Sequence, residues 1–111
     1  MALTQKVKVS VSRYGNVPVI HAVEGDTGRE VEAEFLDLTL TSGMTAELWY
    51  ARPDGVIGHT AGTVDDSANT VTAEIDDAIA KAGRVPVQIK ITDSGELVSC
   101  FAFVIIVQSN N

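Results

Sequence analysis

Hydrophobic and polar residues alternate along most of this chain, and this period of two constrains its fold more than any other feature. Between Arg29 and Phe35, three small or aromatic hydrophobic residues alternate with three glutamates, and Arg84 to Thr92 repeats the pattern with valine and isoleucine. Successive side chains of a strand point to opposite faces, so each run predicts a strand with one buried and one wet face. About eight such runs recur at spacings of roughly 8–12 residues, which predicts an all-β, antiparallel β-sandwich.

One segment departs from the alternation and predicts a short helical turn. Asp76 to Ala82 begins with two aspartates, contains alanines and is followed by Gly83. Acidic residues favour a helix start, and glycine favours its end. The segment is long enough for only about two turns, so we expect a connector.

Two turn motifs separate strands. Gly25-Asp26-Thr27-Gly28 offers two glycines for positive φ and an aspartate that can bond its own backbone, and Pro53-Asp54-Gly55 combines a preset proline with a closing glycine. We single out these structural turn residues: Gly25, Asp26, Thr27, Gly28, Pro53, Asp54 and Gly55.

The last two predicted strands carry information about their neighbours. Pro86 lacks an N–H, so the strand Arg84 to Thr92 is predicted to be an edge or to have that position facing away from its neighbour. Glu96 to Val107 is apolar on both faces from Phe101 onward, which predicts a central strand.

Length and charge restrict the classes of function. The 111 residues predict a single β-sandwich domain over 1–108, with a polar tail at 109–111. The net charge of −7 disfavours nucleic acid and anionic membranes as partners. Acidity of this size mainly promotes solubility. The N-terminus has no apolar signal region, and Phe101 to Val107 is too short to span a bilayer as a helix.

Candidate reactive groups are few and scattered. Cys100 stands alone in an apolar context, which predicts a small buried hydrophobe, and His21 and His59 lack the spacing of metal ligands. Asp65 to Asn69 lacks the calcium-loop pattern and predicts a solvated turn. With no nucleophile elbow or glycine-rich phosphate loop, we expect no catalytic, cofactor or metal site and no enzyme activity.

Trp49 has two interpretations of equal weight. It shares a strand face with Glu47 and Ala51, opposite Leu48. A tryptophan on an exposed face suggests a protein or sugar contact, whereas one between two layers would be core. Trp49 and Pro86 are therefore the candidate contact surface.

The order of these motifs resembles a known family. Val23 to Arg29 with its Gly-Asp-Thr-Gly turn, Arg52 to Gly55, and Asp93-Ser94-Gly95 leading into the apolar final strand are similar to the N-terminal domain of phage baseplate upper proteins. Domains at the base of phage head and tail fibres are also similar. The resemblance covers about residues 17–107.

The resemblance implies an immunoglobulin-like β-sandwich that attaches parts of a virion to one another, without enzymatic activity or cofactors. It therefore leads us to expect a phage or prophage structural protein of the baseplate, tail tip or capsid surface, such as a head-fibre base or decoration protein. Its expected partners are other virion proteins and further copies of itself. We expect it to be made in the host cytoplasm and to reside in the virion. Symmetric assemblies favour a homo-oligomer.

A carbohydrate-binding β-sandwich displayed on a particle or cell is the alternative. It requires exposed aromatic rings that form a platform for sugars. The exposure of Trp49 and Tyr14 discriminates between the two hypotheses, because burial of both would remove the platform.

Overall fold

The computed structural model describes residues 3–11 and 17–109, with only the backbone at residue 101. Eight strands are seen in this part of the chain, and no helix. Their bounds are β1 Leu3–Val9, β2 Val19–Val23, β3 Arg29–Phe35, β4 Thr45–Ala51, β5 Ile57–Asp65, β6 Thr70–Ile75, β7 Gly83–Asp93 and β8 Glu96–Gln108.

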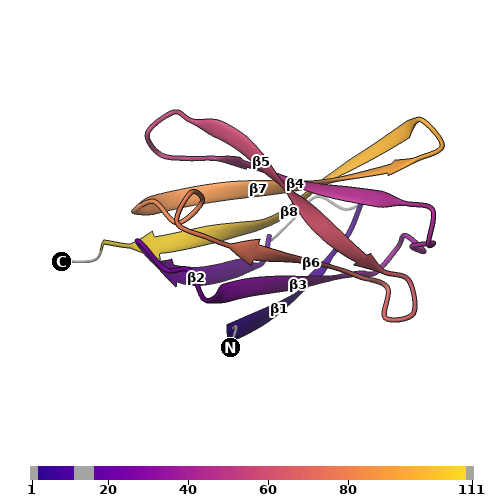
Figure 1. Cartoon of the computed structure of the whole chain (residues 1–111), viewed down its shortest axis with the longest axis horizontal. Helices are drawn as coiled ribbons and strands as arrows, with labels where there is room; N and C mark the ends of the chain where they lie inside the picture. Colours follow the sequence, from indigo (N-terminus) through magenta and orange to yellow (C-terminus); the bar gives the residue numbers. More distant parts are fainter. Residues whose placement is uncertain (1–2, 12–16, 110–111) are drawn as a thin grey trace.

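The strands form one continuous mixed sheet in the order β1-β3-β6-β5-β4-β7-β8-β2 (Figure 1). The inner pairs are antiparallel, whereas β1 pairs with β3 and β2 pairs with β8 in parallel. The sheet curls until its two end strands meet, so it is nearly closed into a barrel.

Strand β5 joins the two parts of the sheet, because it pairs first with β4 and then with β6. Its first part, Ile57–Gly62, pairs with β4, and its last part, Thr63–Asp65, pairs with β6. In Figure 1, β5 crosses diagonally from the β4 side to the β6 side. Glycine permits this path: a Cβ at Gly62 would lie 2.6 Å from Val71 Cγ1. The close approach to the core therefore depends on the missing side chain.

A side chain completes the near-closure between β1 and β2. The Gln5 carboxamide donates from Nε2 to the His21 carbonyl at 2.8 Å, and its Oε1 accepts from the His21 N–H at 3.1 Å. Arg29 Nη1 also donates to the His21 carbonyl, at 3.2 Å. Backbone groups on the open edge of β2 thus receive partners without a strand ladder.

The inner face of the curled sheet forms the hydrophobic core. Phe103, Ile75, Ile89, Ile105 and Val85 are among its largest fully buried side chains. They come from β6, β7 and β8. Buried and more exposed residues alternate along β7, as predicted, whereas Ala102 to Ile105 of β8 are all buried or nearly so, as expected for a strand that is apolar on both faces. Burial of one face of every strand against the others is the main stabilising contribution.

The predicted antiparallel immunoglobulin-like sandwich is wrong, although the all-β class is right. Alternation shows which side chains face the core, but it does not show which strand lies beside which. The two parallel pairs arise from long-range pairing of β1 with β3 and β2 with β8. Since β5 pairs on both sides in turn, a single sheet takes the place of two separate layers.

The predicted helical turn over Asp76 to Ala82 is also wrong. Asp76 does cap a turn: its carbonyl accepts from Ala80 N at 2.9 Å, and its Oδ1 accepts from Ala78 N at 3.0 Å. The chain then bends away, because Lys81 N bonds the Ile79 carbonyl at 2.8 Å. Ile79 and Ala80 are buried in the core. Their burial outweighs the helix preference of a segment too short to propagate one.

The neighbours of the last two strands resolve the two predictions made for them. Strand β8 is central, between β7 and β2, as its apolar faces predicted. Strand β7 is also central and not an edge. Pro86 is tolerated because the ladder of β4 with β7 ends at Tyr50 and Val87, so β4 requires no N–H from position 86. Within the described ranges no helix is long and apolar enough to cross a membrane.

Candidate interaction surface

The outer face of β4, β5 and β7 carries a cluster centred on Trp49. Trp49 is partly exposed, and its ring stacks on His59 of β5 with centroids 4.5 Å apart and an interplanar angle of 26°. Lys90 of β7 places Nζ 4.3 Å from the centroid of the Trp49 ring. Because β5 and β7 flank β4, the two groups approach from opposite sides of its strand. We call Glu47, Trp49, His59, Pro86 and Lys90 the Trp49 face.

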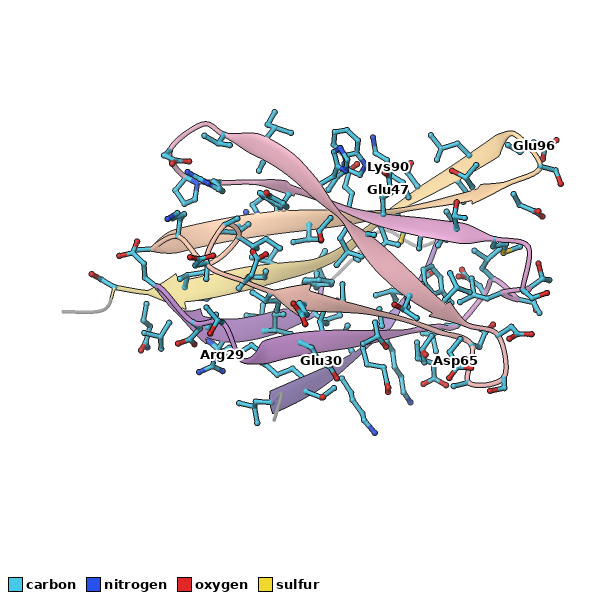
Figure 2. The ribbon with its side chains drawn as sticks, viewed as in Figure 1. Arg29, Glu30, Glu47, Asp65, Lys90 and Glu96 are labelled. Carbon is cyan, nitrogen blue, oxygen red and sulfur yellow. The ribbon has the colours of Figure 1, made fainter. Side chains whose placement is uncertain are left out.

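Polar contacts within the Trp49 face hold the indole ring in place. Trp49 Nε1 donates to Glu47 Oε1 at 3.3 Å, and the other oxygen of Glu47 lies 3.5 Å from His59 Nδ1. Glu47 and His59 are each about half exposed, at 50% and 51% of their side-chain surface. Figure 2 shows Lys90 and Glu47 close together on this outer face. The cluster therefore presents a stacked indole and imidazole, with Lys90 over the indole ring and Glu47 at its N–H.

Pro86 lies on the same outer face as Trp49. Trp49 is opposite Gln88 in the ladder of β4 with β7, and Pro86 is two residues before Gln88. The inward neighbours Val85 and Val87 are buried, which confirms that Pro86 points outward. The two residues singled out from the sequence as a contact surface thus fall on neighbouring strands of one face.

The Trp49 face offers little open ring for a sugar. A stacking platform requires an unobstructed aromatic face, whereas His59 and Lys90 both lie over this indole. Tyr14, the second aromatic residue of the carbohydrate hypothesis, lies outside the described residues. No observation on the described surface favours sugar binding.

The Gly-Asp-Thr-Gly segment forms the turn between β2 and β3. Gly25 has a φ of 90°, and Asp26 N donates to the Val23 carbonyl at 3.0 Å. The Asp26 carboxylate accepts from Arg29 Nε and from Val23 N. The hydrogen bond from Arg29 lowers the pKa of Asp26 below its usual range, with a smaller contribution from the Val23 N–H. These hydrogen bonds therefore stabilise the turn between β2 and β3.

The Pro-Asp-Gly segment closes the hairpin between β4 and β5. Gly55 has a φ of 90° and donates to the Arg52 carbonyl at 3.0 Å. Arg52 pairs with the Asp54 carboxylate, and this hydrogen bond lowers the pKa of Asp54. Arg52 Nη1 also reaches the Ala78 carbonyl at 3.1 Å, which ties the hairpin to the turn before β7.

The side chains considered as metal ligands either lie on distant strands or form hydrogen bonds within their own turn. His21 lies on β2 and His59 on β5, with β4, β7 and β8 between these strands in the sheet. Asp65 Oδ1 accepts from Ser67 Oγ at 2.7 Å and from Ala68 N at 3.2 Å, and these bonds lower the pKa of Asp65. In residues 3–11 and 17–109, no three histidine, cysteine or acidic side chains are grouped to hold a metal ion.

The thiol of Cys100 is inward-facing on β8, as its apolar context predicted. It is buried at 6% exposure. Burial raises the pKa of the Cys100 thiol, so it stays protonated and unreactive near neutral pH.

Two residues with important contacts were not identified from the sequence. Gln5 bonds both backbone groups of His21, and Asn69 bonds three backbone groups of the connection between β3 and β4. Gln5 looks like an ordinary polar position in an alternating strand. For Asn69 a signal existed, because asparagine tolerates the left-handed conformation that ends a hairpin turn.

Comparisons with known proteins place this geometry in context. No protein-family model matches the sequence. No curated protein sequence matches it either.

The solved structures do contain a similar fold. The "N-terminal domain of phage TP901-1 ORF48" superposes with a TM-score of 0.68 over 95% of this chain and 98% of that chain, at 13% sequence identity. At this level of identity the likeness is one of fold. The chain therefore has the fold of a domain found in a phage protein, which agrees with the phage resemblance in the sequence.

Proposed function

We propose that this protein is a non-catalytic structural component of a phage or prophage virion, which joins other virion proteins through the Trp49 face. Its fold, shared along nearly the whole chain with the phage TP901-1 ORF48 domain, supports the phage setting. The turn motifs that resemble baseplate upper proteins support a place in the baseplate, tail tip or capsid surface.

The single observation that supports the contact role is that Trp49 is partly exposed and held in a fixed orientation. Its ring is partly exposed on a regular strand, yet it is held between His59 and Lys90 and bonded to Glu47. A side chain held in this way loses little conformational entropy on binding, so the exposed part of the stacked Trp49–His59 pair is preorganised for a protein contact. Tryptophan is enriched at the centre of protein interfaces.

Replacement of Trp49 tests the role directly. We expect the wild-type chain to be found by mass spectrometry in virions purified from an induced or infected culture, and the Trp49→Ala chain to be lost from them. Leu36→Ala is the matched control, because Leu36 is an exposed hydrophobic residue at 58% exposure away from the Trp49 face. Circular dichroism of both variants checks that they remain folded.

Two results would contradict the proposal. Absence of the wild-type chain from purified virions would remove the virion role. Equal incorporation of Trp49→Ala and wild type would leave the virion role in place but assign the contact to another surface. Light scattering on the wild-type chain tests the proposed homo-oligomer separately.

A further inference from the structure

A fork opens in the sheet where β5 separates from β6. Their ladder contains only three residue pairs and ends at Thr63 and Thr72. Beyond it β5 turns toward β4, while the rest of β6, Ala73–Ile75, continues along β3 (Figure 1). The facing edges of Thr60–Gly62 and Ala73–Ile75 therefore have no ladder with each other.

The fork forms a pocket of about 320 Å³. Small side chains line most of it, so a further backbone can approach either strand. Its lining residues are Glu30, Thr60, Ala61, Thr63, Thr72, Ala73 and Glu74. An unpaired strand edge with room beside it is a site at which another extended chain can add.

Two carboxylates stand at the rim of the fork. Glu30 and Glu74 are directly opposite in the ladder of β3 with β6 and share the outer face (Figure 2 labels Glu30). Glu30 accepts a hydrogen bond from Thr4 Oγ1 at 2.7 Å, but in the described part of the chain no lysine or arginine pairs with either glutamate. Like charges opposite one another destabilise a sheet, and a cation between them would relieve this repulsion.

We propose that the β5–β6 fork binds an extended, lysine- or arginine-bearing segment of a different protein, which adds to the edge of β6. The added strand would lie about 4.8 Å from β6 and cover about 10 Å of its free edge. A basic side chain paired with Glu74 would share its face and reach the two carboxylates. A second copy of this chain, with its net charge of −7, is disfavoured as the occupant of this acidic site. The fork adjoins the Trp49 face, since Ala61 of its lining is opposite Glu47 in the ladder of β4 with β5, but this inference does not depend on the virion role.

A peptide titration, followed through the amide chemical shifts of this protein, tests whether the fork binds an added strand. The probe is a blocked seven-residue peptide of alternating valine and lysine, compared with a glutamine version and with a version N-methylated at alternate residues. We expect the lysine peptide to shift the amides of Thr60–Gly62 and Ala73–Ile75. The glutamine peptide should bind more weakly, and the N-methylated peptide should not bind, because it cannot form a ladder.

Charge variants distinguish binding at the fork from general attraction of the lysine peptide to an acidic protein. Glu74→Gln should weaken binding of the lysine peptide roughly two- to fivefold, as expected for an exposed ion pair. Glu34→Gln also removes one carboxylate from the outer face, on the neighbouring strand β3, but at a position outside the pocket lining. It should leave binding of the lysine peptide unchanged. Both positions are solvent-accessible, so the variants should fold.

Three outcomes would overturn the proposal. Equal binding of the N-methylated peptide would exclude strand addition, and equal weakening by the two variants would show only general attraction to an acidic protein. A dimer of the free chain that the lysine peptide disrupts would assign the fork to a second copy.

Discussion

At the scale of single residues, Asn69 carries an unusual share of the local order. It adopts a left-handed conformation, with a φ of 60°, at the end of the turn between β5 and β6. Its Nδ2 donates to the Phe35 and Leu38 carbonyls at 2.9 and 2.8 Å, and its Oδ1 accepts from Leu40 N at 2.7 Å. One carboxamide thereby anchors the chain between β3 and β4 to the β5–β6 turn.

We expect Asn69→Gly to lower the free energy of unfolding by about 2–4 kcal/mol, since three partly buried hydrogen bonds are lost. Asn69→Ala should cost about 1 kcal/mol more, because alanine resists the left-handed conformation that glycine accepts. Urea unfolding followed by fluorescence measures both. A glycine variant as stable as wild type would show that the carboxamide bonds contribute nothing net.

At the scale of elements, two features determine how the sheet curls. The seam of β1 and β2 is joined through the side chain of Gln5, and β5 crosses the core at Gly62. Neither feature is a regular ladder, so each depends on a particular residue.

Gln5→Ala should expose the edge of β2 at the seam. We expect hydrogen exchange at the His21 amide to accelerate and the free energy of unfolding to fall by about 1 kcal/mol, because one residue supplied both bonds. Lys6→Ala is the control: Lys6 is largely exposed, and the distance from its Nζ to Glu32 Oε2 in their ion pair is 3.9 Å. A His21 amide that stays protected in Gln5→Ala would show that the seam is held by other contacts.

Gly62→Ala should disturb the crossing of β5. The added methyl would meet Val71 Cγ1 at 2.6 Å and Leu48 Cδ1 at 3.2 Å, so the strand or the core must shift. We expect a loss of about 1–3 kcal/mol in the free energy of unfolding. Gly43→Ala should be nearly neutral, since nothing lies within 4 Å of its added Cβ. Equal stability of the two variants would contradict the role assigned to Gly62.

At the scale of the whole molecule, three aspartates couple the stability to pH. The pKa values of Asp26, Asp54 and Asp65 are lowered below 3.8 by hydrogen bonds from Arg29, Arg52 and Ser67, respectively. Each carboxylate closes a different turn. Folding therefore favours their ionised forms.

We expect the urea midpoint to fall as the pH is lowered through about 4 toward 2. In that window the unfolded chain binds protons more readily than the native chain, so the stabilisation present above the unfolded pKa is lost. The triple variant Asp26→Asn, Asp54→Asn, Asp65→Asn should show a flatter pH dependence and a lower midpoint at neutral pH. An unchanged acid slope in this variant would place the coupling at other carboxylates.

The sequence predicts the positions of strands better than it predicts how the strands pair or which residues share a surface. The strands were located well, because alternation is a local property: β3 and β7 lie where their patterns predicted. Trp49 and Pro86 were predicted as candidate contact residues from the sequence, but their common face and the stacking on His59 required the pairing of strands.

The sequence by itself determined that the chain forms strands, which side chains turn inward and where the glycine-containing turns fall, because these depend on neighbours in the chain. Only the tertiary structure decided that β1 and β2 pair in parallel with distant strands, that β5 joins both halves into one nearly closed sheet, and that Ile79 prefers the core to a helix. These outcomes depend on contacts between residues far apart in sequence, and their free energies outweigh the local preferences that a pattern records.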